Sequence, residues 1–306
     1  MFEKILLVTR RTRLAGLVER FNTKKQAKFY VENAGQDFDE FEREDASYAR
    51  AVDRLRDSLD VGLPVQQVDR SLVPTFLFTG KEIVVVAGQD GLVANVAKYV
   101  GEQPLVGVNP DPDRFDGVLL PYEVPGARAA VRKVLDGKAR TRGVTLAEAR
   151  LEDGQRLLAF NDLFIGARTH VSARYRLSHG GQEEAQSSSG VLVSTGAGSS
   201  GWLSSVFTLA RGLTARTGGV PGEAWRLSWE EPRLAFVVRE PFVSRNSGAE
   251  LVGGFVTAEE ELVLESRMPS GGVIFSDGME EDFLAFGAGA RAHIRPAKQR
   301  ARLVMA

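Results

Sequence analysis

The first half of the chain alternates short apolar runs with helical stripes of apolar side chains. In Ile83–Val86 four β-branched residues follow one another without polar alternation, which predicts a strand covered on both faces, as in a parallel sheet. Similar apolar runs occur at Ile5–Val8 and Leu105–Val108. Apolar residues at helical spacing follow the central run, beginning at Val93. Strands that alternate with helices in this way predict an open α/β domain over residues 1–137.

Two stretches of this half do not follow the alternation. Residues 33–45 are acidic and aromatic without clear periodicity, so we expect them to cover a surface or to meet a partner chain. Helical spacing resumes from Ser47. Arg10, Arg11 and Arg13 follow the first strand and could hold phosphate, but a solvated basic turn is the favoured interpretation.

Beyond Gly137 the apolar pattern changes to a period of two. Val144–Leu151 and Ala173–Leu177 alternate between apolar and polar residues, as half-buried strands do. Helical spacing is nearly absent, with Trp202–Leu213 as the exception. Further strand-like segments are Leu157–Phe160, Gly190–Ser194, Trp225–Trp229, Leu234–Val238 and Glu261–Leu264. We therefore expect a second, mainly β domain whose antiparallel sheets pack face to face.

Composition narrows the class of protein. The 306 residues suffice for two domains, and a formal charge of −1 argues against nucleic-acid and membrane-surface binders. No run approaches the ~18 apolar residues of a transmembrane helix, and Met1-Phe2-Glu3-Lys4 leads into a strand rather than a signal peptide, so we expect a soluble, cytoplasmic protein. The absence of cysteine excludes thiolate chemistry, and the three histidines are not spaced as a metal pair. Any metal would be a hard cation held by oxygens, such as Mg²⁺ arriving with a nucleotide.

The central apolar run ends at the turn Gly88-Gln89-Asp90-Gly91. In an open α/β sheet, ligands and phosphates bind at the carboxyl ends of strands, where the next helix presents free N–H groups. Gly88 and Gly91 would allow close approach of a ligand, and Asp90 could accept a proton or hold a metal. An ordinary turn with Asp90 at a helix N-terminus explains the same residues.

Three turns in the second half carry polar groups. Residues 196–201 fit Gly-x-Gly-x-x-Gly, but no βαβ unit with a late acidic residue follows, which argues against a dinucleotide fold of the dehydrogenase type. The same turn is rich in hydroxyls and could bind a ribose or phosphate, or simply cap a helix. Asn161-Asp162 ends an apolar strand and could meet a carboxamide or a ribose. Gly272–Met279 has a strand followed by Asp-Gly, which most often forms a hairpin turn.

In order and spacing these motifs together resemble the NAD kinase family. That family has a Gly-Gly-Asp-Gly-Thr turn in an α/β domain, then Asn-Glu and a Thr-x-x-Gly-Ser turn in a β-sandwich domain. The matching stretches here are Gly88–Leu92, Asn161-Asp162 and Ser194–Trp202. The likeness is closest to the mitochondrial type, and it extends over Gly107–Arg114, Asn161–Gly166, Ser188–Gly190, Arg239–Arg245 and Gly272–Gly278.

The resemblance implies a fold, a reaction and a set of residues. The fold is a Rossmann-like, phosphofructokinase-like α/β domain over residues 1–137 and about 287–306, with a β-sandwich NAD-binding domain over 138–286. The reaction is transfer of the ATP γ-phosphoryl group, with Mg²⁺, to the 2′-hydroxyl of the adenosine ribose of NAD(H). Asp90 takes the place of the base, beside the phosphate turn of Gly88, Gln89 and Gly91. Residues implied to bind NAD are Asn161, Asp162, Ser189, Thr195, Ser200, Gly201, Trp202 and Ser205. The resemblance also implies a homodimer.

The sequence departs from the family pattern at its catalytic turn. Gln89 stands for the second glycine, and would strain the turn by ~1 kcal/mol or more if that position needs a positive φ. Leu92 replaces the threonine, and Asp162 is one methylene shorter than the usual glutamate. A weak or inactive dinucleotide-binding homologue, or a kinase acting on a lipid or another hydroxyl, therefore remain alternatives to an active NAD(H) kinase.

Overall fold

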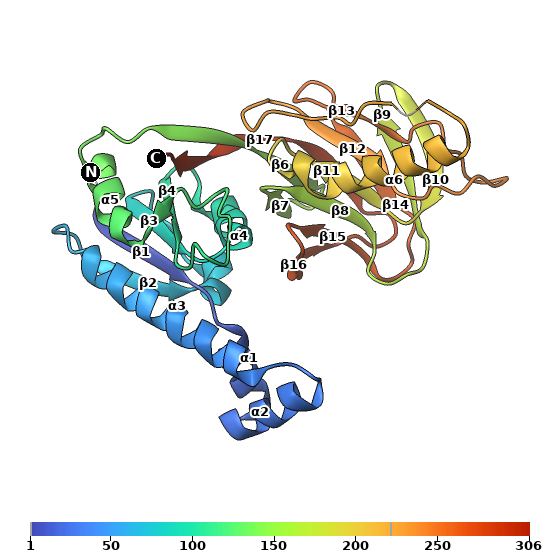
Figure 1. The fold of residues 1–306 in the computed structure, drawn as a ribbon. Coiled ribbons are helices and arrows are strands. Elements are labelled where there is room, and N and C mark those ends of the chain that lie inside the picture. Colours follow the sequence, from blue (N-terminus) through green and yellow to red (C-terminus); the bar gives the residue numbers. More distant parts are fainter. Residues whose placement is uncertain (1, 221) are drawn as a thin grey trace. The chain divides into compact units, whose positions relative to one another are not determined.

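The computed structural model describes residues 2–220 and 222–306 (Figure 1). The chain divides into two compact units, Met1–Arg142 with Arg302–Ala306, and Gly143–Ala301. The returning segment is shorter than the sequence led us to expect. Most of the last strand, β17 (Arg291–Val304), pairs with the second unit, and its end at Arg302 and Leu303 pairs in parallel with β4 (Pro104–Asn109) of the first.

The first unit is built on a parallel sheet in the order β4-β3-β1-β2, with β5 and the end of β17 along the outer side of β4. All six residues of β3 are buried, which confirms the prediction of a strand covered on both faces. The remaining strands are β1 (Lys4–Thr9), β2 (Val65–Asp69), β3 (Glu82–Ala87) and β5 (Tyr122–Glu123). The helices are α1 (Arg13–Phe21), α2 (Lys24–Asn33), α3 (Phe38–Ser58), α4 (Asp90–Val100) and α5 (Ala127–Leu135), with short turns η1 (Arg70–Thr75) and η2 (Val124–Gly126).

Helices cover this sheet because their apolar stripes face it. Side chains of α3 and α5, such as Leu55 and Val131, form one core with Ile5, Ile83 and Val106 of the strands. Helix α4 packs on β3 and η1 and buries most of its side chains. The predicted stripe beginning at Val93 is therefore confirmed as the buried face of α4.

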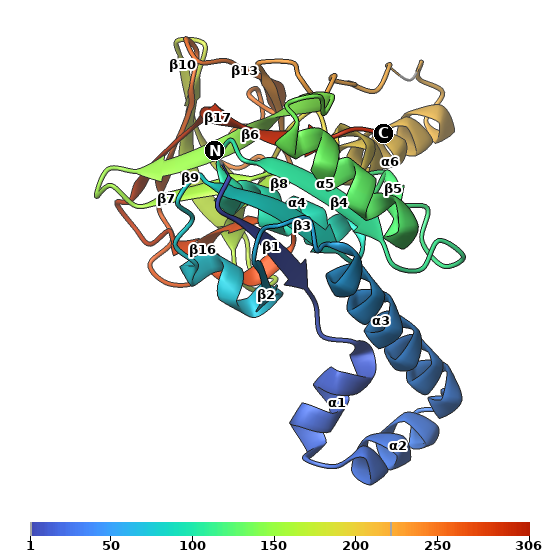
Figure 2. The ribbon, with the colours of Figure 1, turned by 90° about the vertical axis from the view of Figure 1, so that its left-hand side faces the viewer.

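Residues 38–45 are helical although their sequence shows no clear periodicity, so the helix indicated from Ser47 begins earlier. Helix α3 begins at Phe38, where the Asp37 carboxylate accepts a hydrogen bond from the Asp39 N–H at 2.9 Å. Phe38 and Phe41, one turn apart, are buried in a small separate core with residues of α1 and α2. Figures 1 and 2 show α1 and α2 beside this end of α3, away from the sheet of the first unit. The periodicity was hidden because acidic residues fill the exposed face of the same helix turns.

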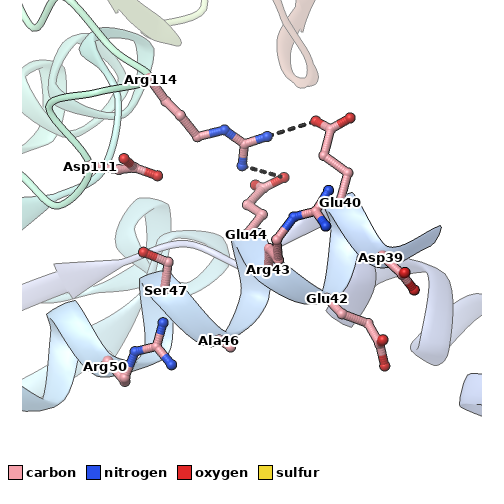
Figure 3. A pocket seen from close by; sticks show the side chains of 10 residues that line it. All are labelled: Asp39, Glu40, Glu42, Arg43, Glu44, Ala46, Ser47, Arg50, Asp111 and Arg114. Carbon is pink, nitrogen blue, oxygen red and sulfur yellow. Dashed lines mark hydrogen bonds and ion pairs between the residues drawn. The ribbon is translucent and has the colours of Figure 1, made fainter. Parts of the chain in front are cut away.

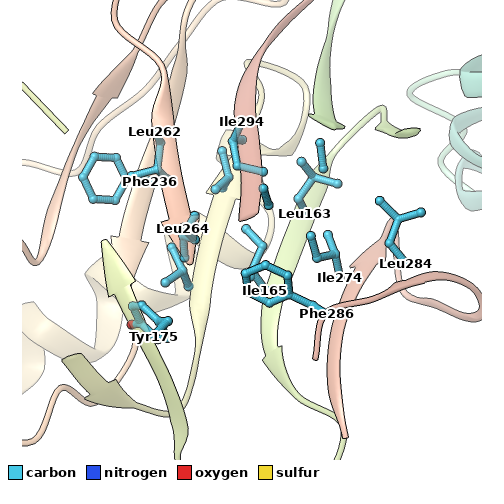
Figure 4. Packing of buried hydrophobic residues seen from close by; sticks show 14 of the residues in the cluster. Leu163, Ile165, Tyr175, Phe236, Leu262, Leu264, Ile274, Leu284, Phe286 and Ile294 are labelled. Atoms are coloured by element: carbon cyan, nitrogen blue, oxygen red, sulfur yellow. The ribbon is translucent and has the colours of Figure 1, made fainter. Parts of the chain in front are cut away.

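The second unit is a sandwich of two largely antiparallel sheets. One has the order β10-β9-β14-β17, with β6 and β7 beside β17, and the other β13-β12-β11-β8-β15-β16. Their inner faces share one apolar core around Ile165, Tyr175, Phe236, Leu264 and Ile294 (Figure 4). The strands are β6 (Thr141–Leu151), β7 (Arg156–Ala159), β8 (Asp162–Ala167), β9 (Ala173–His179), β10 (Gln182–Ser188), β11 (Val191–Ser194), β12 (Leu234–Val238), β13 (Gly253–Val256), β14 (Leu262–Ser266), β15 (Gly272–Ser276) and β16 (Met279–Ala285).

One long helix, α6 (Trp202–Arg216), and the turn η3 (Gly198–Ser200) interrupt the strands, as the sequence predicted for this region. The strand expected at Trp225–Trp229 does not form. Its apolar residues Trp225 and Leu227 pack instead with Leu203 of α6 on the outer face of β11 and β12. Within the described residues, no helix is both long and apolar enough to cross a membrane.

Candidate functional site

The turn between β3 and α4 holds Asp90 as the first residue of the helix. Gln89 has φ −108° and ψ 166°, an extended conformation open to any residue, so the strain expected there does not arise. Gly88 is buried, and a Cβ at this position would lie 2.6 Å from Leu92 Cδ2. Leu92 is itself 4% exposed, so its side chain fills the space above the glycine. The replacement of threonine by leucine therefore adds to the core rather than leaving a gap.

The Asp90 carboxylate anchors the loop that follows β4. Oδ1 accepts a hydrogen bond from Leu119 N–H at 2.8 Å, and Oδ2 accepts one from Val118 N–H at 3.1 Å. The loop comes this close because Gly107 has no side chain, since a Cβ there would lie 2.1 Å from the Leu119 carbonyl oxygen. Both oxygens of the predicted base thus accept a backbone hydrogen bond, and each keeps a second lone pair with which it could accept a proton.

The buried side chain of Asn109 shapes the same loop at its beginning. Its amide donates to the Phe115 carbonyl at 2.8 Å and its oxygen accepts from Asp111 N–H at 3.0 Å. Arg114, at the middle of the loop, lies 2.7 Å from Glu40 and 3.8 Å from Glu44 of α3 (Figure 3). The loop that contacts Asp90 is therefore fastened at both ends and in the middle.

The arginines that follow β1 are held by carboxylates. Glu44 accepts from Arg13 Nε at 2.6 Å and from Arg10 Nη2 at 3.1 Å, and Arg11 pairs with Glu19. Burial alone would raise the pKa of Glu44, but the hydrogen bonds from Arg13 and Arg10 hold its pKa below the ordinary value. The interpretation as a solvated basic turn fits Arg11 and Arg13, whose side chains are 53% and 47% exposed, but not Arg10, which is 14% exposed and paired with Glu44.

Tyr48 of α3 links the ends of β1 and β3 by hydrogen bonds. Its hydroxyl donates to the Ala87 carbonyl at 2.8 Å and accepts from Arg10 N–H at 2.9 Å. The chain passes from β1 to β2 on one side, whereas β3 and β4 lie on the other. Such a switch point is where open α/β sheets bind ligands, and a cavity of about 570 Å³ lined by Thr9, Arg10 and Tyr48 lies beside it.

We expect Tyr48→Phe to destabilise the first unit by ~1–3 kcal/mol, because it leaves two buried backbone groups without their partner. Hydrogen exchange of the Arg10 amide should become faster than in Tyr30→Phe, a matched loss of a hydroxyl from an exposed ring. Equal exchange rates in the two variants would contradict this role for Tyr48.

In the second unit a cavity of about 380 Å³ lies over the outer face of β8 and β15. Asn161, Asp162 and Trp202, three of the residues predicted to bind NAD, line it together. The other lining residues are Phe164, Ala167, Arg168, Phe275, Asp277, Gly278 and Glu280. The structure therefore brings together residues that are up to 119 positions apart in the sequence, from Asn161 to Glu280.

Aromatic rings form one wall of this cavity. The Phe164 ring stacks on Trp202 with centroids 5.8 Å apart and on Phe275 at 6.3 Å. It lies flat because Gly166 and Gly190 stand beneath it, where a Cβ would come within 2.8 Å of its ring atoms. The faces of these rings offer a stacking surface for a planar heterocycle.

Polar groups also line the cavity. Within the described residues, Asp162 Oδ1 is buried and has no hydrogen-bond partner. Burial, together with the negative charge of Asp277, raises the pKa of Asp162 from 3.8 to about 7, although a hydrogen bond with Ser194 acts in the opposite direction. A carboxyl that carries a proton near neutral pH can both donate and accept, as a ligand carboxamide requires.

The serine-rich turn at residues 194–201 does not line this cavity, but it contacts the residues that do. Thr195 is fully buried, and its hydroxyl donates to the Phe160 carbonyl at 2.6 Å and accepts from Gly198 N–H at 3.2 Å. A Cβ at Gly198 would lie 2.7 Å from Asp162 Oδ1, so a glycine is needed there. The remaining predicted contacts are exposed and lie outside the cavity lining: Ser189, Ser200, Gly201 and Ser205.

The role of Asp277 is not evident from the sequence. The segment Gly272–Met279 forms the predicted hairpin between β15 and β16. The carboxylate of Asp277 also reaches the backbone of residues 160–162, more than 110 positions earlier. The Asp-Gly pair signalled a turn, and nothing in the sequence signalled its distant partner. Phe164, Arg168, Phe275 and Glu280 were likewise not singled out as cavity residues.

Within residues 2–220 and 222–306, no cluster of three or more His, Asp or Glu side chains is arranged to hold a metal ion. The residues present fit a dinucleotide better, because the cavity combines a stacking wall with an unpartnered buried acceptor. The Mg²⁺ predicted to accompany ATP remains an expectation.

No family model matches the chain. Among curated proteins it is 27% identical to the rat protein "NAD kinase 2, mitochondrial", over 65% of this chain and 63% of that protein. It is 26% identical to the human protein of the same name, over 65% of this chain and 60% of that protein. The matches thus span less than two thirds of these relatives.

Two solved structures share the fold. A yeast NADH kinase, determined with NADH, superposes with a TM-score of 0.56 at 12% identity, over 100% of this chain and 84% of that one. An NAD kinase from Archaeoglobus fulgidus, determined with ATP, gives 0.53 at 16% identity, over 98% of this chain and 92% of that one. The α/β domain followed by a β-sandwich is the fold predicted from the sequence. The chain is thus similar to NAD kinases in sequence and shares their fold.

Proposed function

We propose that this protein is an NAD(H) kinase, which transfers the γ-phosphoryl group of ATP to the 2′-hydroxyl of the adenosine ribose. The observation that carries the proposal is the cavity in which Asn161, Asp162 and Trp202 meet. These residues were predicted from the family motifs, and the fold brings them to one place. Relatives that match in sequence and fold bear the names NAD kinase and NADH kinase.

In this proposal the residues of the two units have different roles. The aromatic wall of Phe164 and Trp202 would stack on the nicotinamide ring, while Asn161 and Asp162 would hydrogen-bond its carboxamide. Asp90, at the N-terminus of α4, would accept the proton of the attacking hydroxyl. ATP would supply the phosphoryl group, and Mg²⁺ would neutralise the negative charge of the phosphates. Gly88, Gln89 and Gly91 form the turn that leads into α4. They would bind the phosphates there, because the free N–H groups of a helix N-terminus attract anions.

The deciding experiment is to incubate the pure protein with MgATP and either NAD or NADH, and to measure NADP(H). Formation of NADP(H) that requires the nucleotide triphosphate supports the proposal. If the protein binds NAD and forms no product, the inactive-homologue alternative holds. That alternative is favoured by one observation, the engagement of both Asp90 oxygens by Val118 and Leu119.

A kinase of another hydroxyl is the remaining alternative. The stacking wall and the amide and carboxyl groups of the cavity fit a nicotinamide better than a lipid chain, because a chain would leave the buried Asp162 Oδ1 without a partner. Phosphorylation of a lipid or a simple alcohol in a substrate screen, without turnover of NAD(H), would overturn the NAD assignment.

Several further expectations belong to this proposal. The predicted NAD-binding residues that do not line the cavity remain part of the proposal: Ser189, Thr195, Ser200, Gly201 and Ser205. A homodimer is expected from the resemblance. The cytoplasmic location is expected from the sequence, while the two curated relatives are named as mitochondrial proteins. Analytical ultracentrifugation and localisation of the tagged protein would test the last two.

A further inference from the structure

The short segment Phe160–Asp162 joins β7 to β8 and presents two side chains to the cavity. Every backbone polar group of this segment has a partner, and two residues supply all of them. The Asp277 carboxylate accepts hydrogen bonds from all three backbone N–H groups. The N···O distances are 2.9 Å for Phe160, 2.6 Å for Asn161 and 3.3 Å for Asp162. The Asp277 N–H donates to the Asp162 carbonyl at 3.0 Å.

Thr195 holds the other two carbonyls. Its hydroxyl donates to Phe160 at 2.6 Å and its N–H donates to Asn161 at 2.9 Å. A segment whose donors and acceptors are all satisfied from outside has little freedom to rotate, because any rotation leaves a buried polar group unpaired. The directions of the Asn161 and Asp162 side chains are therefore fixed by Asp277 and Thr195.

The conformation of Asp277 is adapted to this contact. Its φ is +53°, in the left-handed region that aspartate and asparagine tolerate better than most residues. Gly278, also at positive φ, completes the turn into β16. A simple hairpin turn does not require a carboxylate that reaches another strand. The Asp277 side chain therefore does more than form the turn, because it holds the backbone of residues 160–162.

We propose that Asp277 is the positioning residue of the dinucleotide cavity: through the backbone of Phe160–Asp162 it sets where Asn161 and Asp162 meet the nicotinamide end of the substrate. The inference rests on the proposed function for the identity of the ligand. The contacts themselves do not depend on it. Thr195 was a predicted NAD-binding residue, whereas Asp277 was predicted only as part of a turn.

Asp277 also acts on the charge of Asp162. The groups that face Asp162 are Ser194 on the neighbouring strand and Asp277 in the hairpin turn, with Arg168 and Glu280 along the same cavity. The negative charge of Asp277 is one of the causes of the raised pKa of Asp162. Removing that charge while keeping the shape should lower the pH at which Asp162 loses its proton, a change that the loss of a distant carboxylate would not produce.

The test uses the full chain and three variants. Asp277→Asn keeps the shape and the left-handed tolerance but replaces one acceptor oxygen with a donor. Asp277→Gly keeps the backbone conformation and removes the carboxylate. Asp153→Asn is the control, because Asp153 lies in the hairpin between β6 and β7, accepts from Gln155 N–H at 3.0 Å, and loses the same charge.

Calorimetric titration with NAD from pH 5 to 9 should show affinity at least ~10-fold weaker in Asp277→Asn than in wild type, and unchanged in Asp153→Asn. Nuclear magnetic resonance of the Asp162 carboxyl carbon, without ligand, should show its titration midpoint at lower pH in Asp277→Asn only. Asp277→Gly should bind NAD still more weakly while its tryptophan fluorescence reports a folded second unit, where all three tryptophans lie.

The outcomes separate this inference from the proposed function. If wild type does not bind NAD, the proposed function fails, and the carboxyl titration still decides the role of Asp277. A folded Asp277→Asn with NAD affinity within twofold of wild type and an unmoved Asp162 midpoint overturns the inference. Unfolding of both Asp277 variants also overturns it, because Asp277 would then serve the fold as a whole.

Discussion

Replacement of Asp90 by asparagine is expected to lower kcat for NADP(H) formation by ~10²–10⁴, the usual range for removal of a general base. An amide of the same shape cannot accept the proton of the attacking hydroxyl. Its remaining oxygen can still accept one of the two amide hydrogen bonds, from Leu119 or Val118. The affinity for NAD should therefore stay close to that of wild type, as measured by calorimetric titration beside steady-state kinetics.

The control for this variant is Asp116→Asn. Asp116 is exposed in the loop that Asp90 anchors, and its replacement removes the same charge without touching the turn after β3. We expect its kcat to match that of wild type. A kcat for Asp90→Asn within a few-fold of wild type would reject the base. A parallel loss of NAD binding would instead assign Asp90 to holding the loop.

Replacement of Asp162 by asparagine is expected to stabilise the second unit above neutral pH. The pKa of Asp162 is raised from 3.8 to about 7 in the folded protein, mainly by burial. Between these values the folded state holds a proton that the unfolded state has released, so the wild-type free energy of unfolding falls as pH rises from about 4 to 7. Asparagine does not ionise and avoids this loss, which amounts to a few kcal/mol.

Urea unfolding followed by tryptophan fluorescence at pH 5 and pH 8 measures the difference. The stability gained by Asp162→Asn over wild type should be larger at pH 8 than at pH 5. Asp153→Asn is expected to differ from wild type by the same amount at pH 5 and pH 8, because hydrogen bonds from Gln155 lower the pKa of Asp153 and its contribution is lost only below the ordinary pKa of 3.8. An advantage of Asp162→Asn that does not change with pH would contradict the raised pKa.

The sequence predicted the elements whose patterns are local. Four β-branched residues in Ile83–Val86 require cover on both faces, and β3 is buried along its whole length. Alternation in Ala173–Leu177 predicted β9, and the single helical stripe from Trp202 predicted α6. In two other segments the structure depends on packing that the local pattern does not report. The start of α3 hides two buried phenylalanines among acidic residues, and Trp225–Trp229 packs its apolar residues under α6 without pairing as a strand.

The sequence by itself predicted the two-part fold and the likeness to NAD kinases, and it proposed residues for the site. Asp90, Asn161 and Asp162 each stand at the end of an apolar run, and their order along the chain was enough to suggest the NAD kinases. The extended conformation of Gln89 was left to the tertiary structure, because φ at a non-glycine turn is not encoded by residue type alone.

Only the tertiary structure decided what each of these groups touches. It engages Asp90 with the amides of Val118 and Leu119, buries Asp162 so that its pKa rises, and joins Asp277 to a backbone more than 110 residues away. The physical reason is that hydrogen bonding and burial at these positions depend on segments distant in the chain. Local periodicity reports which face of an element is buried, and it carries no information about which distant group will lie against it.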